Sequence, residues 1–466
     1  MAKRQFDVAV IGSGPGGYIA ALRCAQLGMK TACIEKSIPL GGTCLNVGCI
    51  PSKALLNSSE HYLWLHSESA LHGINIKEAT FDFGIMQSRK QKVVEGLTNG
   101  VASLFKKHSV TRVIGSAKFS SANLLEVVNG KEKQVVEAEN IIIATGSIPV
   151  ALPFLPFDED KVVSSTGALA LLKVPKKMLV VGAGVIGVEL ASVYQRLGAE
   201  VVLIEMLDRI CFPMDTAISK SLQQILTKQG LKFHLSTKVK HGGAGTTGIK
   251  LTIQNEQGDQ EISGDIAIVA IGRRPYTEDL GLKPFGIQTN SKGFITVDGN
   301  FRTTLDHVYA IGDVIEGPML AHKASEEGVA VAEILAGLKP HINYMAIPNV
   351  VYTSPEAASV GMTESEAREA RLPVKIGVCS LRALARARAI GESEGFIKII
   401  GEENTGRVIG LHILAPQASE MIAEGVIAIE KKATLLDIAT ASHAHPTLSE
   451  GVKEAALNAL GRALAF

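Results

Sequence analysis

The sequence has no long apolar run, almost no net charge and few cysteines. No uninterrupted apolar stretch approaches the ~18 residues that a membrane-spanning helix needs, so we expect no membrane span. The formal net charge is only +1, which gives no electrostatic signature of nucleic-acid binding. An apolar strand pattern begins at Phe6, before any segment with the features of a secretory signal. We therefore expect a cytoplasmic protein, and the sequence leaves open whether a transit peptide has been removed.

We expect no disulfide framework, because the expected cytoplasm is a reducing compartment. Cys44 and Cys49 stand close together, in the segment GGTCLNVGCIPSK at 41–53. The others stand singly among apolar residues, as inert buried thiols commonly do, and they are Cys24, Cys33, Cys211 and Cys379.

The spacing of Cys44 and Cys49 argues against a metal site and against a structural staple. A lone pair of cysteines lacks the second Cys/His pair that structural zinc needs, so we predict no metal. A disulfide that closes so short a ring removes only about 2 kcal/mol of unfolded-state entropy. The neighbouring Gly41, Gly42 and Gly48 suit close approach of a cofactor better than core packing, which favours a redox pair over two inert thiols.

A dinucleotide-binding pattern occupies the N-terminal segment FDVAVIGSGPGGYIAALRCAQLGMKTACIEK. It reads as a buried strand, a glycine turn, a helix and a second strand, with Gly12, Gly14 and Gly17 in the G-x-G-x-x-G positions. Gly12 permits the turn, Gly14 lets the backbone approach a pyrophosphate, and Gly17 permits close helix packing. Glu35 ends the second strand, where an acid binds a ribose hydroxyl.

The same pattern returns in MLVVGAGVIGVELASVYQRLGAEVVLIEM, with Gly182, Gly184, Gly187 and Glu205 in the corresponding positions. One such motif is weak evidence, but two copies after two apolar strands predict two dinucleotide sites. Glu205 favours NAD, because a carboxylate repels the 2′-phosphate of NADP. The nearby Arg209 leaves the NADP alternative open.

Four further segments resemble motifs of a known protein family. They are AENIIIATGSIP at 138–149, HVYAIGDVIEGPMLAHKA at 307–324, IPNVVYTSPEAASVGMTE at 347–364 and HAHPTLSE at 443–450. Together with the glycine motifs and the cysteine segment, they make the sequence resemble the pyridine nucleotide-disulfide oxidoreductases over essentially its whole length. The resemblance implies FAD at the first glycine motif and NAD at the second.

The resemblance assigns positions around both cofactors. Glu35 is expected on the adenosine ribose, Lys53 near the reactive edge of the flavin, and Glu189 beside it as the acid paired with Lys53. The implied cofactor-binding residues are Gly12, Gly14, Gly17, Glu35, Lys36, Gly42, Thr43, Lys53, Ala117, Thr145, Gly146, Ser147, Asp313, Met319, Leu320, Ala321 and His322, and Gly182, Gly184, Gly187, Glu189, Glu205, Val239 and Gly272.

The resemblance also gives the cysteines and a histidine their roles. It implies that Cys44 exchanges with the substrate disulfide and that Cys49 lies against the flavin. His445 is the implied acid/base catalyst and Glu450 the residue that orients it. A base is needed because a thiol with an ordinary pKa near ~8.5 is mostly protonated at neutral pH. The implied reaction is oxidation of protein-bound dihydrolipoyl groups by NAD⁺.

Other interpretations of the His445 segment remain open at this point. Thr447 and Glu450 also have the spacing of a capping box for a following helix. His443 and His445 would lie on one face of an extended segment, as metal ligands do.

The predicted fold is α/β, with two Rossmann-like dinucleotide-binding domains and a C-terminal α+β dimerisation domain. At 466 residues the chain is about three times the ~150-residue size of a typical domain. We expect an FAD domain at 1–147, an NAD domain at 148–274, a central segment at 275–345 that completes the FAD site, and the interface domain at 346–466.

The expected partners are a second copy of the chain and the lipoyl domains and acyltransferase core of 2-oxoacid dehydrogenase complexes, or a glycine cleavage complex. By the resemblance, each active site takes its cysteines from one chain and its histidine from the other. The alternatives are an NADP-dependent reductase of glutathione or a similar disulfide, and a redox-silent assembly subunit. Glu205 disfavours the first, and the Cys44, Cys49 and His445 set disfavours the second.

Overall fold

The computed structural model describes residues 3–246 and 248–464. The chain divides into two compact units. Unit 1 comprises the residues up to Leu55 with Gly84–Val150 and Gly272–Ile342, and unit 2 comprises Leu56–Phe83, Ala151–Ile271 and the residues from Asn343 onward. Helices α3 (Cys49–Ser67) and α4 (Phe83–Lys107) contain residues of both units. The four predicted domain boundaries stay a prediction.

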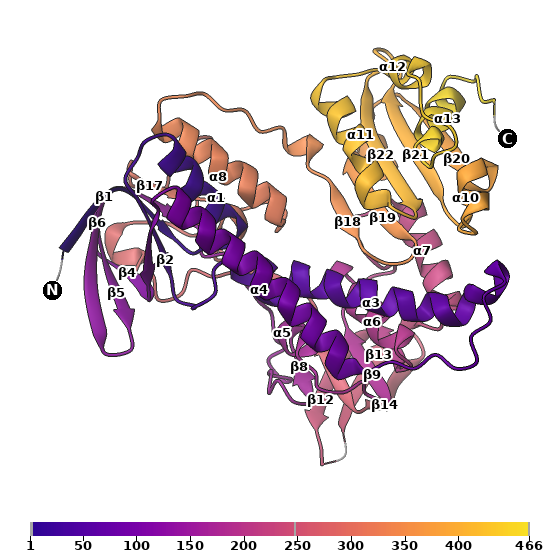
Figure 1. Cartoon of the computed structure of the whole chain (residues 1–466), viewed down its shortest axis with the longest axis horizontal. Helices are drawn as coiled ribbons and strands as arrows, with labels where there is room; N and C mark the ends of the chain where they lie inside the picture. Colours follow the sequence, from indigo (N-terminus) through magenta and orange to yellow (C-terminus); the bar gives the residue numbers. More distant parts are fainter. Residues whose placement is uncertain (1–2, 247, 465–466) are drawn as a thin grey trace. The chain divides into compact units, whose positions relative to one another are not determined.

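Unit 1 is built on a sheet in the order β3-β2-β1-β6-β5-β4, with β17 paired to β6. Strands β1, β2, β3, β6 and β17 pair in parallel, whereas β4 and β5 join antiparallel. The central strand β1 has neighbours on both edges, and Val8, Ala9 and Val10 are completely buried there, which explains its continuous apolar run. Helices α1 and α8 pack against each other beside this sheet (Figure 1). The elements of unit 1 are β1 (Lys3–Ile11), α1 (Pro15–Gln26), β2 (Thr31–Glu35), α2 (Gly42–Val47), β3 (Thr111–Ile114), β4 (Ser116–Ser121), β5 (Leu124–Asn129), β6 (Glu132–Ile143), β7 (Ser147–Pro149), β16 (Arg273–Pro275), β17 (Val308–Ala310) and α8 (Ala321–Leu335).

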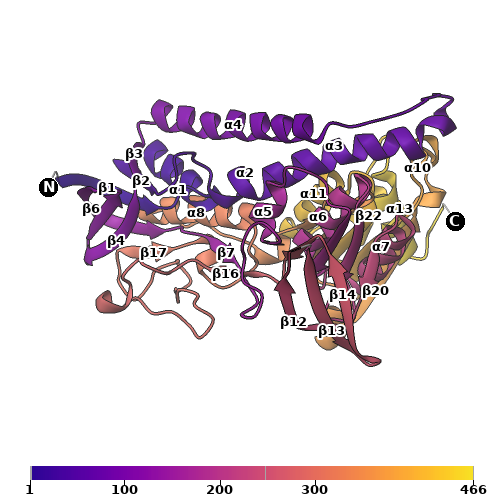
Figure 2. The same cartoon turned by 90° about the horizontal axis from the view of Figure 1, so that it is seen from below.

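Unit 2 begins with a second parallel sheet, in the order β11-β10-β9-β15-β8. An antiparallel sheet of β12, β13 and β14 follows (Figure 2). The first sheet repeats the β1–α1–β2 arrangement with β9, α6 and β10, which confirms the second Rossmann-like domain. The elements here are β8 (Val162–Val163), α5 (Ser165–Leu169), β9 (Lys177–Val181), α6 (Val185–Arg196), β10 (Glu200–Ile204), α7 (Thr216–Lys228), β11 (Lys232–His234), β12 (Lys238–Ala244), β13 (Ile249–Asn255), β14 (Gly258–Gly264) and β15 (Ile266–Val269).

The C-terminal part of unit 2 is an antiparallel sheet in the order β18-β19-β22-β21-β20 (Figure 1). Helix α11 packs on β19 and β22, and α13 packs on β20 and β21, which gives the expected α+β layer. The elements are β18 (Asn349–Val351), β19 (Glu356–Gly361), α9 (Glu364–Glu369), β20 (Val374–Ser380), α10 (Ala385–Ala389), β21 (Phe396–Glu402), β22 (Val408–Ala415), α11 (Ala418–Glu430), α12 (Leu435–Thr440) and α13 (Glu450–Ala459).

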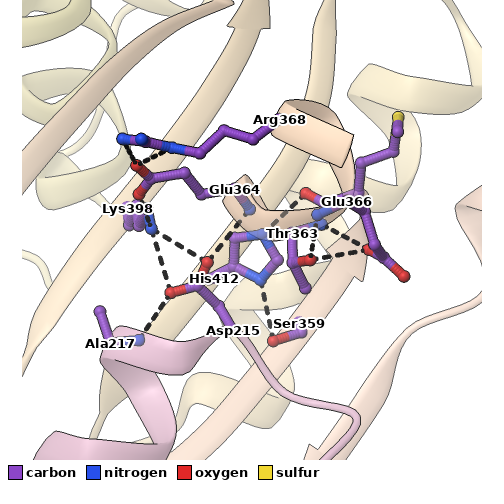
Figure 3. Close-up of polar contacts among 10 residues, drawn as sticks. Asp215, Ala217, Ser359, Thr363, Glu364, Glu366, Arg368, Lys398 and His412 are labelled. Carbon is purple, nitrogen blue, oxygen red and sulfur yellow. Dashed lines mark hydrogen bonds and ion pairs between the residues drawn. The ribbon is translucent and has the colours of Figure 1, made fainter. Parts of the chain in front are cut away.

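A buried ionic cluster joins α7 to this sheet within unit 2 (Figure 3). Nζ of Lys398 lies 2.9 Å from Oδ2 of Asp215 and 2.7 Å from Oε2 of Glu364. Asp215 also caps α7 by accepting the backbone N–H of Ala217 at 3.0 Å. Beside it, the ring of His412 is held by Ser359 and the Met362 carbonyl. Each charge in the cluster therefore has a partner of opposite sign, as burial requires.

Candidate active site

The first glycine turn has the shape that a pyrophosphate needs. Gly12 has φ of 100°, and a Cβ there would meet the Ala144 carbonyl, so only glycine fits. Gly14 is the N-cap of α1, has no side-chain cap bond, and would have open space around an added Cβ. Gly17 lies against the carbonyl of Gly12. The N–H groups at the start of α1 thus face an open cradle, and these residues fit a dinucleotide phosphate.

The second turn reproduces this geometry. Gly182 has φ of 99°, Gly184 is the N-cap of α6 with open space beside it, and Gly187 lies against the carbonyl of Gly182. The internal repeat seen in the sequence is therefore a repeat in three dimensions, and the second turn fits a second dinucleotide.

The acids Glu35 and Glu205 are anchored in the same way. Oε2 of Glu35 accepts the N–H of Ser13 at 2.9 Å, and Oε2 of Glu205 accepts the N–H of Ala183 at 2.7 Å. In each case Oε1 accepts a second backbone N–H, from Ser37 or Leu207, at 2.9 Å. The carboxylates are held rigidly at the strand ends, where ribose hydroxyls bind.

The cation near the second acid is engaged elsewhere. The guanidinium of Arg209 lies 4.7 Å from the ring centroid of Phe212, and Nη1 lies 3.9 Å from Asp208. Met206 and Leu207, which follow Glu205, are exposed and apolar. The anchored carboxylate of Glu205 is therefore the feature of this environment that favours NAD over NADP.

The cysteine pair lies beside the first glycine turn. Cys44 is in α2 and Cys49 is the first residue of α3, and their thiols are hydrogen-bonded to each other. A Cβ on Gly42 would lie 2.6 Å from Cα of Gly14, so α2 packs directly on the turn. The hydrogen bond to Cys49 and burial raise the pKa of the Cys44 thiol, against the opposing charge of Lys53. A thiol in this setting needs a base to remove its proton.

Ser147 and Asp313 come together from segments far apart in the sequence. Oγ of Ser147 donates to Oδ2 of Asp313 at 2.5 Å. Oγ1 of Thr145 donates to the carbonyl of Tyr276 at 2.6 Å, and the N–H of Tyr276 donates to the carbonyl of Gly146. The 145–147 turn is thereby fixed to Tyr276 and Asp313, as a segment that closes over a cofactor requires.

Sequence reasoning missed a buried ion pair behind Asp313. Nζ of Lys323 lies 3.0 Å from Oε1 of Glu327, and both side chains are almost fully buried in α8. Oε2 of Glu327 accepts the N–H of Gly312 at 2.7 Å, and Nζ donates to the Gly312 carbonyl. Their spacing on one helix face was the available signal. Arg273, which contacts Ser147, was also missed.

The remaining expected cofactor residues are spread over both units. Nζ of Lys36 lies 4.1 Å from the ring centroid of Tyr276. Glu189 is buried in unit 2 and accepts the N–H of Tyr352 at 3.0 Å, whereas Lys53 belongs to unit 1. The other positions are Thr43 in α2, Ala117 in β4, Val239 in β12, Gly272 before β16, Met319 and Leu320 before α8, and Ala321 and His322 in its first turn. Their binding roles stay a prediction.

His445 and Glu450 form a pair in unit 2. Nδ1 of His445 lies 2.8 Å from Oε1 of Glu450, and the imidazole is 71% exposed. Oε2 of Glu450 accepts the N–H of Thr447 at 2.8 Å, but α13 begins at Glu450 with Ser449 as its N-cap, so Thr447 and Glu450 do not form the capping box that their spacing suggests. Burial opposes ionisation, but the Thr447 N–H and His445 outweigh it and lower the pKa of Glu450.

His443 has different partners. Nε2 lies 2.9 Å from Oε1 of Glu424, and Nδ1 lies near the carbonyl of Ala441. Within 3–246 and 248–464, we find no group of three or more His, Cys, Asp or Glu side chains placed to hold a metal ion. In the same ranges no helix is both long and apolar enough to cross a bilayer.

A nucleotide turn packed against a hydrogen-bonded cysteine pair is the arrangement of a thiol–disulfide oxidoreductase that works with a dinucleotide. The chain belongs to the pyridine nucleotide-disulphide oxidoreductase family, whose model matches residues 6–328. The dimerisation-domain model of the same family matches residues 347–456.

Curated relatives cover nearly the whole chain. It is 49% identical to the mitochondrial dihydrolipoyl dehydrogenase of Pisum sativum over 97% of this chain and 91% of the relative. It is 48% identical to the mitochondrial dihydrolipoyl dehydrogenase of Homo sapiens over 99% and 92%, and 48% identical to the leghemoglobin reductase of Glycine max over 97% and 87%.

Two solved structures of similar fold also cover nearly the whole chain. The HOCl-induced flavoprotein disulfide reductase RclA from Escherichia coli has a TM-score of 0.85, 27% identity, and coverage of 97% of this chain and 99% of that one. LpdA from Mycobacterium tuberculosis has a TM-score of 0.90, 25% identity, and coverage of 98% and 99%.

These comparisons confirm the family, the α/β fold class and FAD and NAD as cofactors. The expected enzyme class, an NAD-dependent dihydrolipoyl dehydrogenase that contains FAD, is confirmed as well.

Proposed function

We propose that this chain oxidises protein-bound dihydrolipoyl groups with NAD⁺, with Cys44 and Cys49 as the reacting thiol pair. The observation that carries the proposal is the contact between these two thiols beside the first glycine turn. Glu35 and that turn would hold FAD, and Glu205 and the second turn would hold NAD. FAD held at the first turn would supply the two-electron transfer between the cysteine pair and NAD⁺.

The substrate dithiol is oxidised in two thiol–disulfide exchange steps. One substrate thiolate attacks the sulfur of Cys44 in the oxidised pair, which breaks the bond between Cys44 and Cys49 and releases Cys49 as a thiolate. The second substrate sulfur then attacks the mixed disulfide and releases Cys44. The substrate leaves as a disulfide, and the two cysteines have been reduced by two electrons.

His445 moves the protons in this scheme. It takes a proton from the substrate thiol, so that a thiolate is available for each exchange. The lowered pKa of Glu450 keeps this carboxylate ionised, and its contact with Nδ1 orients the ring and leaves Nε2 to exchange the proton.

The proposed active site is shared between two copies of the chain. His445 lies in the 347–456 segment that matches the dimerisation-domain model, and the cysteines lie outside it. A heterodimer of inactive Cys44→Ser and inactive His445→Ala chains tests this. One of its two sites then has intact cysteines and an intact histidine, so activity returns to about half of the wild-type level per dimer. A heterodimer as inactive as its parents rules out the shared site.

The function itself is tested by NADH formation. Purified protein with bound FAD is given NAD⁺ and either free dihydrolipoamide or reduced lipoyl domains from each candidate complex, including 2-oxoacid dehydrogenase and glycine cleavage. We expect turnover with NAD⁺ and loss of turnover in Cys44→Ser. A preference for NADPH and glutathione disulfide contradicts the proposal. The predicted cytoplasmic location is checked separately by cell fractionation.

A further inference from the structure

Arg273 donates two hydrogen bonds to Ser147 from different nitrogen atoms of its guanidinium group. It opens strand β16, which pairs antiparallel with β7. Its Nε donates to Oγ of Ser147 at 2.7 Å, and its Nη2 donates to the backbone oxygen of Ser147 at 2.6 Å. The planar guanidinium therefore fixes both the backbone and the side-chain rotamer of Ser147.

The contact continues to Asp313. Because Oγ of Ser147 accepts a hydrogen bond from Arg273, its own hydrogen is directed at Oδ2 of Asp313, 2.5 Å away. Ser147 is buried, so water does not compete for these bonds. The orientation of the Asp313 carboxylate thus depends on Arg273 through one hydroxyl group.

Arg273 also carries a positive charge beside Ser147 and Asp313. Burial lowers the pKa of Arg273, against the opposing negative charges of Asp313 and Cys49. Arginine stays protonated throughout the useful pH range. The titratable groups that interact with the thiols are Tyr18 from α1, Lys53 from α3 and Arg273 from β16, and Asp313 interacts with Arg273.

We propose that Arg273 is a positioning residue of the flavin site: its forked guanidinium fixes Ser147 and Asp313 for FAD and brings a positive charge to the same site. The proposal rests on the function proposed above, which places FAD at the first glycine turn and Cys49 against it. It assigns to Arg273 two separable effects, one from the shape of the guanidinium and one from its charge.

The chain offers a matched control in the next residue. Arg274 is exposed, and its Nη1 pairs with Oε1 of Glu278 at 2.7 Å. Arg274→Met removes the same charge from the same strand without touching Ser147. An effect that belongs to Arg273 alone must therefore be absent from Arg274→Met.

The first measurement is the release of FAD from purified holoenzyme, followed by flavin fluorescence. We expect Arg273→Met and Ser147→Ala to weaken FAD binding by about tenfold, as happens when the residue behind a ligand-binding side chain is removed. Arg273→Lys keeps the charge but loses the fork, so it also weakens FAD binding. Arg274→Met binds FAD like the wild type.

The second measurement is the pH titration of the long-wavelength absorption of a Cys49 thiolate against flavin, in a Cys44→Ser background. Removal of a nearby cation makes a thiolate less favourable, so Arg273→Met moves the midpoint up by about 1 pH unit. Arg273→Lys restores the midpoint, and Ser147→Ala leaves it unchanged. Together, the two measurements separate charge from shape.

The outcomes distinguish this inference from the function on which it rests. If Cys44→Ser alone shows no thiolate absorption, the proposed function fails. If that absorption is present but Arg273→Met changes neither its midpoint nor FAD release, the role of Arg273 is wrong. If Arg273→Met does not fold, Arg273→Lys provides the test. FAD release at the wild-type rate in that variant overturns the role of the two hydrogen bonds from the guanidinium to Ser147.

Discussion

Lys323 and Glu327, one turn apart in α8, form an ion pair with side-chain exposures of 1% and 0%. Both groups also bind the backbone of Gly312, which precedes Asp313. The pair therefore holds the end of β17 and its following turn in place. Its removal tests how far a buried charge pair supports the cofactor side of unit 1.

Lys323→Met leaves the Glu327 carboxylate buried without its partner, so we expect a loss of about 3–5 kcal/mol in stability. The measurement is urea unfolding of the FAD-loaded protein, followed by flavin release. Arg23→Met is the control, because the pair of Arg23 with Glu333 in the same unit is partly exposed and contributes less than about 1 kcal/mol. Equal losses in the two variants contradict the prediction.

The two cysteines should differ in colour when replaced singly. Cys44→Ser leaves Cys49 against the flavin, so a long-wavelength absorption band appears at alkaline pH. Cys49→Ser leaves only the outer thiol, so no such band forms. Absorption spectra of the two purified variants check this, and identical spectra would reverse or remove the assigned roles.

Glu205→Ala should reduce the preference for NAD⁺ over NADP⁺. Its carboxylate is anchored by two backbone N–H groups at the end of β10 and repels a 2′-phosphate. We expect the ratio of kcat/KM for NAD⁺ and NADP⁺ to fall by about tenfold or more, in keeping with loss of one charged contact. An unchanged ratio means that Glu205 does not distinguish the ribose hydroxyl of NAD⁺ from the 2′-phosphate of NADP⁺.

Glu450→Gln should lower kcat by about tenfold or more, because the imidazole loses the charge that orients it. The lowered pKa of Glu450 keeps it ionised below the usual carboxyl value of ~4.3, so a decline in activity above that pH does not come from Glu450. Rates across pH check both points. Glu424→Gln, at the partner of His443, is the control and keeps kcat within about twofold.

Lys398→Met should destabilise the protein more at neutral pH than in acid. The hydrogen bond from Lys398 lowers the pKa of Glu364. The stability that this interaction contributes is therefore present above the pKa of an unfolded carboxyl group, and it is lost as the pH falls through the pKa of Glu364 in the folded protein. Unfolding midpoints at about pH 7 and pH 4 measure the difference. Lys228→Met, which breaks the exposed pair with Glu394, serves as control and shows little change at either pH.

The parts that sequence predicted are those encoded within a short stretch. The glycine turns and their acids each lie in one strand–turn–helix–strand unit, so spacing alone indicated them. The contacts of Arg273 with Ser147 and of Lys398 with Asp215 join residues more than a hundred positions apart. No local pattern encodes such pairs, since they depend on which strands the fold makes neighbours. Cys44, Cys49 and His445 were assigned by resemblance, and their roles stay a prediction.

The middle glycine of each dinucleotide turn has a consequence for how mutations are detected. Gly14 and Gly184 have ordinary backbone angles and open space for a Cβ, whereas Gly17 and Gly187 lie against a carbonyl. Alanine at the first two positions is compatible with a fully folded, abundant protein and still occupies the space of a phosphate. Screens that score expression or solubility would therefore pass these variants as neutral, and only a screen for cofactor content would identify them as damaging.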